Sequence, residues 1–405
     1  MNSANIIIIG GGAAGLMAAA RLAGKAQRVV LLEKRERLGR KLLITGKGRC
    51  NLTNMRQWNE FQQHIHPDPN FFKNAFYAFS NQHLVDFLAA SGLETKVERG
   101  ERVFPFSDRS ADVLDTLLQV IQDGGVEVLT NHQVEDLQIR EEGAGFDLMV
   151  TTPKGCVQWF ADRVLVATGG LSYPTTGSTG DGHRWAEGFQ HPMVPCFPAI
   201  TALRPFQMDL NLEGLLLTNV RMDLYVGGTL VQQEEGEFSF TELGMEGGIA
   251  FRVSRKAVRA LINGEKVKVV LDLKPNLTKD QLFARIRREK TTQPGLKLRD
   301  LLRKMLPRQL VEPFLAAHPG LREEKLPDAL KHWEFSIREY GSYARAVVTA
   351  GGVSLKSVSR KTLESKIVPG LYFAGEILDL DGDTGGYNLQ IAFSTAVMAA
   401  EAMAR

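Results

Sequence analysis

The sequence predicts an α/β protein in which one parallel sheet is interrupted by an inserted domain, and three observations support this fold class. A short apolar run, a glycine-rich turn and an alanine-rich helix follow one another at the N-terminus. A strand, a second glycine turn and a long helix close the chain. Short β runs and cationic helices lie between these two parts. With 405 residues the chain has room for two or three domains, each with its own core.

Composition and cysteine usage restrict the class of protein. Hydrophobic residues make up 44% and charged residues 23% of the chain, which is typical of a soluble globular protein. The three cysteines are odd in number and far apart, so neither a disulfide framework nor a metal site is predicted. Residues 6–24 are apolar like a signal-peptide core, but no cationic residue precedes them. We therefore expect a cytoplasmic protein without a membrane span.

The N-terminal motif is typical of dinucleotide-binding proteins. The string "NIIII" has the β-branched character of a strand buried on both faces, and the "GGGAAG" that follows matches G-x-G-x-x-G. Gly10 permits a tight turn, Gly12 lets the backbone approach a pyrophosphate, and Gly15 lets helix and strand pack closely. The helix that begins near Ala13 and Ala14 is expected to turn its free N–H groups toward the phosphates.

The second predicted strand, "RVVLLEK", ends in an acidic residue. Glu33 lies 18 residues after Gly15, where a carboxylate can accept hydrogen bonds from both ribose hydroxyls of an adenosine. Lys34, the next residue, is also expected to contact the cofactor. Together these features predict a Rossmann-like unit. The acid disfavours a 2′-phosphate, but the fingerprint alone leaves open whether the dinucleotide is FAD or NAD.

The string "GRKLLITGKGRCNLTN" (39–54) fails as a Walker phosphate loop, because Lys47 is followed by a glycine. It instead resembles the two-dinucleotide-binding-domain flavoproteins and, among them, the BaiN/RdsA-type NAD(P)/FAD-dependent oxidoreductases. Similar blocks recur over nearly the full length. The resemblance implies a bound FAD, with NAD(P)H as the diffusible electron donor. It further implies that the cofactor is contacted by Arg40, Lys41, Gly46, Gly48, Arg49 and Val134. Of these residues, Val134 would lie at the adenine.

More cofactor contacts are implied near the ends of two later strands. "DRVLVATGG" is a buried strand followed by Thr168 and Gly169, and "GLYFAGE" is a short strand followed by Gly375 and Glu376. By resemblance, Glu376 lies near the ribitol of FAD. The start of the last helix, which would lie near the pyrimidine end of the flavin, consists of Gly386, Tyr387, Asn388 and Leu389. An ordinary helix start is the alternative interpretation.

These features divide the chain into a discontinuous domain and an insertion. Residues 1–195 and 345–405 are expected to form a Rossmann-like FAD-binding domain of the glutathione-reductase type. Residues 196–344 would form an inserted substrate domain. Its first part, about 200–275, alternates short β runs with turns and predicts a small barrel or sandwich. Its second part, about 278–335, is expected to be helical.

Cys50 is the strongest candidate for a catalytic side chain. It lies in a cationic loop with Lys47 and Arg49, which are expected to lower the pKa of its thiol beside the flavin. A thiol in that place can protonate one carbon of an activated C=C bond while the other carbon receives hydride. The alternative is that Cys50 is a small packed residue. Tyr173 and His183 are weaker candidates for a hydrogen-bond donor.

Charge is distributed unevenly along the chain. Residues 252–308 contain 17 Lys and Arg against five Asp and Glu, whereas the net charge of the whole chain is only +3. This segment is either a polyanion-binding surface or a set of solvated helix faces. The resembled family is associated with dihydrouridine formation in ribosomal RNA, and a basic surface fits an RNA partner.

The sequence therefore predicts an FAD-dependent oxidoreductase that reduces uridine to dihydrouridine in ribosomal RNA. One alternative is a small-molecule flavin enzyme, a reductase of an activated C=C bond or an amine oxidase, because such activities are also associated with the family. A flavin-binding protein without turnover is a further alternative. Glu242 stands where the family pattern has a histidine, and Gly248 where it has a proline, so any role of that histidine is in doubt here.

Overall fold

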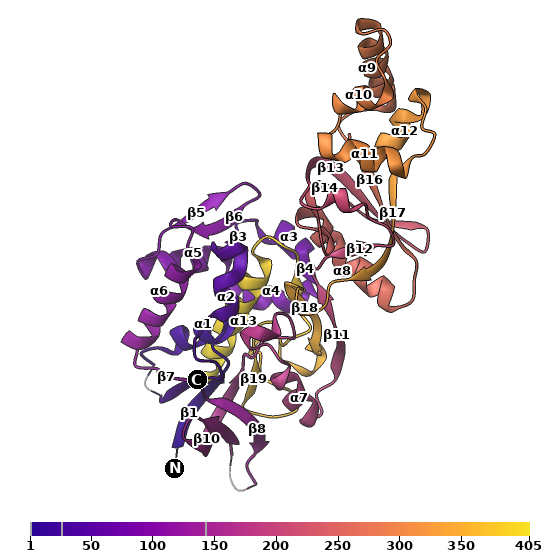
Figure 1. The fold of residues 1–405 in the computed structure, drawn as a ribbon. Coiled ribbons are helices and arrows are strands. Elements are labelled where there is room, and N and C mark those ends of the chain that lie inside the picture. The colour runs from indigo at the N-terminus through magenta and orange to yellow at the C-terminus, as the bar shows by residue number, and fades with distance from the viewer. Residues whose placement is uncertain (1, 26, 142–143) are drawn as a thin grey trace. The chain divides into compact units, whose positions relative to one another are not determined.

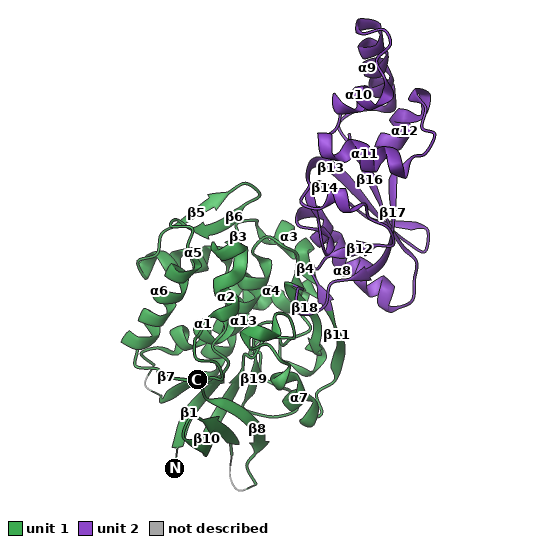
Figure 2. Cartoon of the chain, in the orientation of Figure 1, with its two compact units in different colours: residues 1–197, 347–405 green, residues 198–346 purple. Residues whose placement is uncertain are grey.

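The computed structural model describes residues 2–25, 27–141 and 144–405, which fold into two compact units (Figures 1 and 2). Unit 1 comprises residues 1–197 and 347–405, and unit 2 comprises residues 198–346. The expected boundaries, after residue 195 and before residue 345, lie two residues from these positions. Unit 1 is thus built from both ends of the chain, and unit 2 is an insertion.

The main sheet of unit 1 has the strand order β7-β2-β1-β10-β9-β8, and β19 also pairs with β10. Strands β7, β2, β1, β10 and β19 are parallel, whereas β9 and β8 run antiparallel to their neighbours. The side chains of residues 6–9 and 29–32 are buried, which explains the apolar runs because a central parallel strand is covered on both faces. The strands are β1 (Asn2–Ile9), β2 (Val29–Glu33), β7 (Glu127–Thr130), β8 (Gln133–Ile139), β9 (Phe146–Thr152), β10 (Gly155–Val166) and β19 (Leu371–Phe373).

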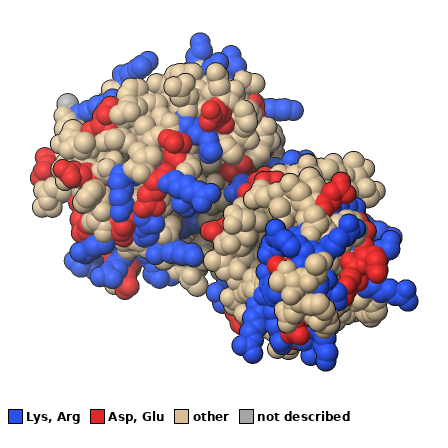
Figure 3. Space-filling model, turned by 90° about the horizontal axis from the view of Figure 1, so that it is seen from above, with Lys and Arg blue, Asp and Glu red and all other residues tan. Residues whose placement is uncertain are grey.

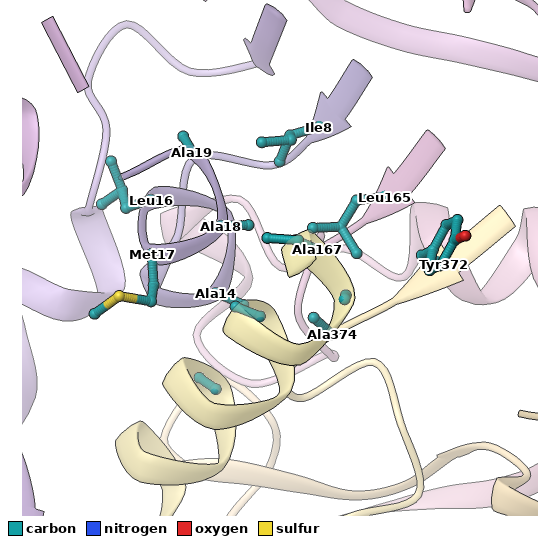
Figure 4. Packing of buried hydrophobic residues seen from close by; sticks show 14 of the residues in the cluster. Ile8, Ala14, Leu16, Met17, Ala18, Ala19, Leu165, Ala167, Tyr372 and Ala374 are labelled. Carbon is teal, nitrogen blue, oxygen red and sulfur yellow. The ribbon is translucent and has the colours of Figure 1, made fainter. Parts of the chain in front are cut away.

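Helix α1 (Ala13–Leu22) packs closely against the C-terminal helix α13 (Tyr387–Met403), and small residues make this possible (Figure 4). Ala14 and Ala18 of α1 are buried there. A Cβ atom added to Gly15 would lie 1.8 Å from the carbonyl oxygen of Gly10, so only glycine allows α1 to lie this close to the first turn. A Cβ added to Gly375 would lie 3.0 Å from that of Ala14.

The remaining elements of unit 1 surround this core. Residues 126–139 contain the two strands β7 and β8 of the main sheet, and the short strand β6 precedes the helix α6. The helices are α2 (Arg40–Ile44), α3 (Trp58–Phe61), α4 (Pro69–Ala78), α5 (Asn81–Ala90), α6 (Ser110–Asp123) and α7 (Asp181–Gly188). The short strands are β3 (Thr53–Asn54), β4 (Ile65–His66), β5 (Thr95–Glu98), β6 (Arg102–Pro105), β11 (Met193–Ala199), β18 (Val348–Val353) and β20 (Asp381–Gly382).

Unit 2 is a closed antiparallel barrel with helices attached to it, and its strand order is β12-β15-β14-β13-β16-β17. The barrel strands are β12 (Leu203–Pro205), β13 (Leu216–Val226), β14 (Thr229–Thr241), β15 (Gly244–Glu246), β16 (Val267–Asp272) and β17 (Trp333–Tyr340). Helix α8 (Gly248–Ile262) follows β15. The helices inserted between β16 and β17 are α9 (Lys279–Thr292), α10 (Leu298–Arg303), α11 (Arg308–Ala317) and α12 (Leu326–Lys331).

The predicted α/β fold with an inserted barrel and a helical part is confirmed, with two corrections inside unit 2. The helical part ends at Lys331, not near residue 335. The next residues form a strand that closes the barrel, in which the buried side chains of Trp333, Phe335 and Ile337 alternate with exposed ones. Helix α8 lies within the part expected to be all β, where its buried face packs on β13 and β14.

Candidate functional site

Unit 1 contains a cleft with about 1280 Å³ of open volume, including its mouth. The cleft lies at the C-terminal ends of parallel strands, because its lining includes the last residues of β1 and β2, Ile9 and Glu33. It also includes Ala167 directly after β10 and Ala374 directly after β19. Ligands of open α/β sheets bind at this edge, where loops from neighbouring strands diverge. The cleft is therefore the candidate site of the molecule.

The glycines of the first turn have different physical reasons for lacking a side chain. Gly10 has φ +106°, and an added Cβ would lie 2.6 Å from the carbonyl oxygen of Ala167. An added Cβ on Gly12 would meet nothing within 4 Å, so this position is open toward the cleft that it lines. Gly10 is thus required by the turn, whereas Gly12 leaves room for something in the cleft.

Glu33 is held in place by backbone N–H groups. Its Oε2 accepts a hydrogen bond from Gly11 N and its Oε1 accepts one from Arg35 N, both at 2.7 Å. The side chain lines the cleft, where its remaining lone pairs can accept hydroxyl groups. Lys34 lines the cleft too, but its ammonium group forms an ion pair with Asp181 of α7 at 2.5 Å. Lys34 therefore ties the start of α7 to the end of β2.

Two helices begin at the cleft with unpaired backbone donors. Their N-caps are Gly12 for α1 and Gly386 for α13, so neither helix has a capping side chain, and neither has an acidic residue in its first turn. The first N–H groups of a helix carry partial positive charge. Ala13 and Ala14 of α1, and Asn388 and Leu389 of α13, line the cleft. Both helix starts can therefore stabilise negative charge in it.

Lys41 and Glu376 form an ion pair at the cleft, with 2.6 Å between Lys41 Nζ and Glu376 Oε2. The other carboxylate oxygen of Glu376 accepts hydrogen bonds from Thr349 N at 2.9 Å and Ser172 Oγ at 3.2 Å. Ser172 and Thr349 were not found by sequence reasoning, and no local signal pointed to them, since they meet Glu376 only through the tertiary fold. This network fixes the carboxylate at one orientation.

The structure brings most of the predicted cofactor residues together around the cleft. Those that line it are Gly10, Gly12, Ala13, Ala14, Glu33, Lys34, Arg40, Lys41, Val134, Thr168, Gly169, Gly375, Glu376, Asn388 and Leu389. Predicted residues outside the lining are Gly15, Gly46, Gly48, Arg49, Cys50, Gly386 and Tyr387. Lining residues that sequence reasoning missed include Arg37, Thr45, His132, Ser178, Trp185 and Val348.

The Arg49 side chain is occupied elsewhere in unit 1. Its guanidinium group forms ion pairs with Glu98 and Asp108, the latter with 2.6 Å between Nη2 and Oδ1. It also stacks over the ring of Phe104, 4.1 Å from the ring centre. These interactions turn Arg49 toward the β5–β6 hairpin, so its charge is not available at the cleft.

The expectation that the pKa of Cys50 is lowered is wrong. Cys50 is fully buried, and this burial raises the pKa of its thiol to about 12, although a hydrogen bond with Thr45 acts in the opposite direction. The sequence suggested the reverse because Arg49 is adjacent, but Glu98 and Asp108 neutralise that cation. A small packed residue, the alternative interpretation, agrees better with this environment. A catalytic role of Cys50 stays a prediction.

Tyr387 is an anchor for the start of α13. Its buried ring lies 4.7 Å from that of Phe61 in an edge-on arrangement and stacks on His64 at 4.5 Å. Its hydroxyl group accepts a hydrogen bond from Arg56 Nη1 at 2.8 Å. The same region holds Asp383, whose two carboxylate oxygens contact His64 Nδ1 at 2.8 Å and His66 Nε2 at 3.0 Å.

The two weaker catalytic candidates, His183 and Tyr173, lie in and just before helix α7. His183 lies mostly buried in α7, where burial lowers its pKa, and its Nε2 lies 3.2 Å from the carbonyl oxygen of Ile377. Tyr173 has φ +52° in the loop before α7.

Among the described residues, no group of three or more His, Cys, Asp or Glu side chains is placed to hold a metal ion. Within the same residues, no helix has the length and apolar character needed to cross a bilayer.

The cleft fits a dinucleotide. Open space faces Gly12, two uncapped helix starts offer donors, and a fixed carboxylate lies at the end of β2. The hydroxyl oxygen of Thr168 is buried and has no hydrogen-bond partner among the described residues, although it lines the cleft. A buried hydroxyl without a partner costs free energy, so a ligand that pairs with it gains affinity.

Comparisons with known proteins show the family and agree with the fold. The family described as "HI0933-like protein Rossmann domain" matches residues 4–402. A 3-dehydro-bile acid delta(4,6)-reductase of Clostridium scindens is 32% identical, and the alignment covers 98% of each chain. A ribosomal RNA dihydrouridine synthase of Haemophilus influenzae is 31% identical, again with 98% of each chain covered. The crystal structure of a 3-ketosteroid-delta4-(5alpha)-dehydrogenase of Rhodococcus jostii shares the fold, with a TM-score of 0.55, 13% identity and coverage of 100% and 97% of the two chains.

Proposed function

Because this chain belongs to the HI0933-like Rossmann-domain family, it is an FAD-dependent oxidoreductase, and we propose that it reduces uridine to dihydrouridine in ribosomal RNA. The family and the named relatives agree with the resemblance to BaiN/RdsA-type flavoproteins. The names of the relatives include both an RNA-modifying enzyme and a small-molecule reductase, at nearly equal identity. The choice between these substrates therefore depends on features of this chain.

The observation that carries the RNA proposal is a set of exposed cations in unit 2. Arg287 and Arg288 on α9, and Lys297 before α10, are exposed and have no ion-pair partner among the described residues. Figure 3 shows Lys and Arg side chains gathered on the part of unit 2 that carries α9 and α10. Unpaired cations on one face attract a phosphate backbone, because each contact releases counterions.

FAD, when bound in the cleft, supplies hydride chemistry through its isoalloxazine ring. The N–H groups at the start of α1 can hold the pyrophosphate, and Glu33 can accept the ribose hydroxyls. The start of α13, with Asn388 and Leu389, carries partial positive charge at the cleft, and this charge would stabilise negative charge on a reduced flavin. Lys41 and Glu376 restrict each other's orientation at the same cleft.

A small-molecule substrate is the second candidate, and the Clostridium relative favours it. Glu242, which replaces the family histidine, lies exposed in the turn between β14 and β15. If that histidine serves the RNA reaction in other members, its loss here fits a different substrate.

NAD(P)H as electron donor and a cytoplasmic location remain parts of the proposal. A flavin protein without turnover has no support from the relatives' names, which are those of enzymes.

The decisive experiment is mass spectrometry of ribosomal RNA from a deletion strain. Loss of dihydrouridine, and its return when the intact gene is supplied, is the expected result. Complementation with a Gly12→Val variant is the matched control, because a side chain at this open position fills the cofactor side of the cleft. Ribosomal RNA that keeps its dihydrouridine after deletion would rule out the RNA substrate and favour the small-molecule candidate.

A further inference from the structure

Unit 2 contains a second cleft, with about 890 Å³ of open volume, that the flavin chemistry does not use. It lies between the start of β13, the loop that follows β16, and the start of α11. Leucine and valine side chains form one part of its lining, including Leu217, Val220 and Leu310. The polar residues of the lining are Thr218, Asn219, Lys274 and Asn276.

Lys274 is a cation without a counter-charge in this cleft. Its side chain is about half buried, and its ammonium group has no hydrogen-bond or ion-pair partner among the described residues. Burial lowers its pKa, and the nearby positive charge of Arg285 lowers it further. A partly desolvated cation beside a second cation is unfavourable, so an anion bound at Lys274 would be stabilised.

The loop that carries Lys274 is fixed by contacts with Asp272 and Lys331. Asp272, whose side chain is fully buried, accepts a hydrogen bond from Lys274 N at 2.8 Å and forms an ion pair with Lys331 at 2.7 Å. Lys331 also donates to the carbonyl oxygens of Lys274 at 3.0 Å and of Leu277 at 2.8 Å. A loop fixed in this way loses little entropy when a ligand binds.

The opposite wall of the cleft is a β-bulge. The pairing of β13 with β14 shifts register between Leu217 and Val220, so that Thr218 and Asn219 are left out of the ladder. Asn219 has φ +54°, a conformation that asparagine tolerates better than most residues. Bulges of this kind often re-aim side chains beside binding sites. The bulge places a hydroxyl and an amide on the cleft, and Asn276 supplies a second amide from the other side.

We propose that this cleft binds one unstacked nucleotide of an RNA chain, with its phosphate at Lys274 and its base held by the apolar residues and the two amides that line the cleft. The proposal rests on the proposed RNA substrate and specifies where unit 2 holds it. Amide groups offer both donors and acceptors, which the edge of a base requires, and single-stranded RNA is recognised by such splayed-out bases. The exposed cations of α9 belong to the same unit and can bind the adjoining backbone.

The test is calorimetric titration of the flavin-loaded, full-length protein with uridine 5′-monophosphate, uridine and inorganic phosphate. We expect the monophosphate to bind at least tenfold more tightly than either of the other two. Lys274→Met should weaken its binding at least tenfold. Lys266→Met, a change at an exposed lysine after α8 that has no ion pair among the described residues, should leave it unchanged. Asn276→Ala, at an exposed position, provides a second variant in case Lys274→Met does not fold.

Several outcomes would overturn the proposal. One is that the monophosphate shows no saturable binding, and another is that the wild type and both cleft variants bind it equally. The proposal would also fail if phosphate alone bound as tightly as the nucleotide, or if a steroid carboxylate such as cholate displaced the nucleotide with higher affinity. Photocrosslinking with 4-thiouridine monophosphate should label the peptide that contains residues 273–277. Because no electron donor is present in these experiments, their failure is distinguishable from failure of the dihydrouridine assay.

Discussion

Lys41 and Glu376 lie 335 residues apart in sequence, yet Lys41 Nζ and Glu376 Oε2 are 2.6 Å apart at the cleft. The two side chains are only 23% and 20% exposed, so water screens the pair less than it screens a surface ion pair. The ion pair joins the segment after β2 to the segment after β19. It thereby connects the two ends of the chain where they form one site.

The first prediction concerns the strength of this ion pair. A double-mutant cycle with Lys41→Met and Glu376→Gln should give a coupling of about 1–2 kcal/mol in the free energy of unfolding, because each single change leaves a partly buried charge unpaired. The matched control is the exposed pair Arg21–Glu401, whose coupling should be about 0.5 kcal/mol or less. Urea denaturation measures both, and equal couplings would contradict the structural role assigned to the cleft pair.

A second prediction separates the two glycines of the fingerprint. Gly15→Ala should prevent folding or destabilise the protein strongly, since the new methyl group would lie 1.8 Å from Gly10 O. Gly12→Ala should keep the stability of the flavin-free protein while weakening FAD binding at least tenfold, because its methyl group enters the open cleft. Gly188→Ala, with nothing within 4 Å, is the control. Thermal unfolding and flavin titration test both, and a Gly12→Ala protein with normal affinity would contradict the proposed pyrophosphate site.

The third prediction is a pH dependence. Burial would raise the pKa of Asp383, but hydrogen bonds with His64 and His66 outweigh it and lower the pKa from 3.8 to about 2. A lowered carboxylate pKa stabilises the fold fully above the unfolded value of 3.8, and this contribution is lost as the pH falls toward 2. Asp383→Asn should therefore cost on the order of 2 kcal/mol at pH 6.

Denaturation in urea between pH 6 and pH 3 tests the Asp383 prediction. The difference between the wild type and Asp383→Asn should stay constant down to about pH 4 and then decrease, in keeping with the unfolded pKa of 3.8. Asp86→Asn, a change at an exposed carboxylate of α5, should show little difference at any pH. A difference that grows on acidification has the wrong sign and would refute the assignment.

The fourth prediction addresses Cys50. Because its thiol is buried and its pKa is raised to about 12, Cys50 should resist iodoacetamide at pH 8 in the folded protein, whereas the exposed Cys156 should react. Cys50→Ala should keep turnover within about fivefold of the wild type. A general acid contributes about 100-fold or more, so a loss of that size with FAD still bound would restore Cys50 as the proton donor.

The fifth prediction concerns the cations of unit 2. Replacing Arg287, Arg288 and Lys297 by glutamine should weaken binding of single-stranded RNA at least tenfold at low salt and reduce the salt dependence of the affinity. Arg303 forms an ion pair with Asp300 at 2.9 Å, so Arg303→Gln should have a smaller effect. Fluorescence anisotropy at several salt concentrations gives both quantities. An unchanged salt slope in the triple variant would mean that RNA does not contact this surface.

The sequence predicted the parts of the molecule that depend on local interactions. The strand, the glycine turn, helix α1 and Glu33 were predictable because their spacing follows from turn geometry and from burial on both faces. The inserted unit was predictable from the change in pattern between residues 195 and 345. The end of the helical part was misplaced because Trp333 and Phe335, two apolar residues on either side of Glu334, suit the end of a helix as well as the start of a strand. Only closure of the barrel decides between them.

The chemical environment of single side chains was decided by the tertiary structure. Sequence neighbours suggested that Arg49 activates Cys50, but Glu98 and Asp108 neutralise the arginine, and the fold buries the thiol. The pairing of Lys41 with Glu376 likewise had no local signal. Motif spacing determines where the backbone turns and which face is buried, because these are short-range properties. Charge and pKa depend on distance and solvent exposure, which are fixed only when distant segments pack together.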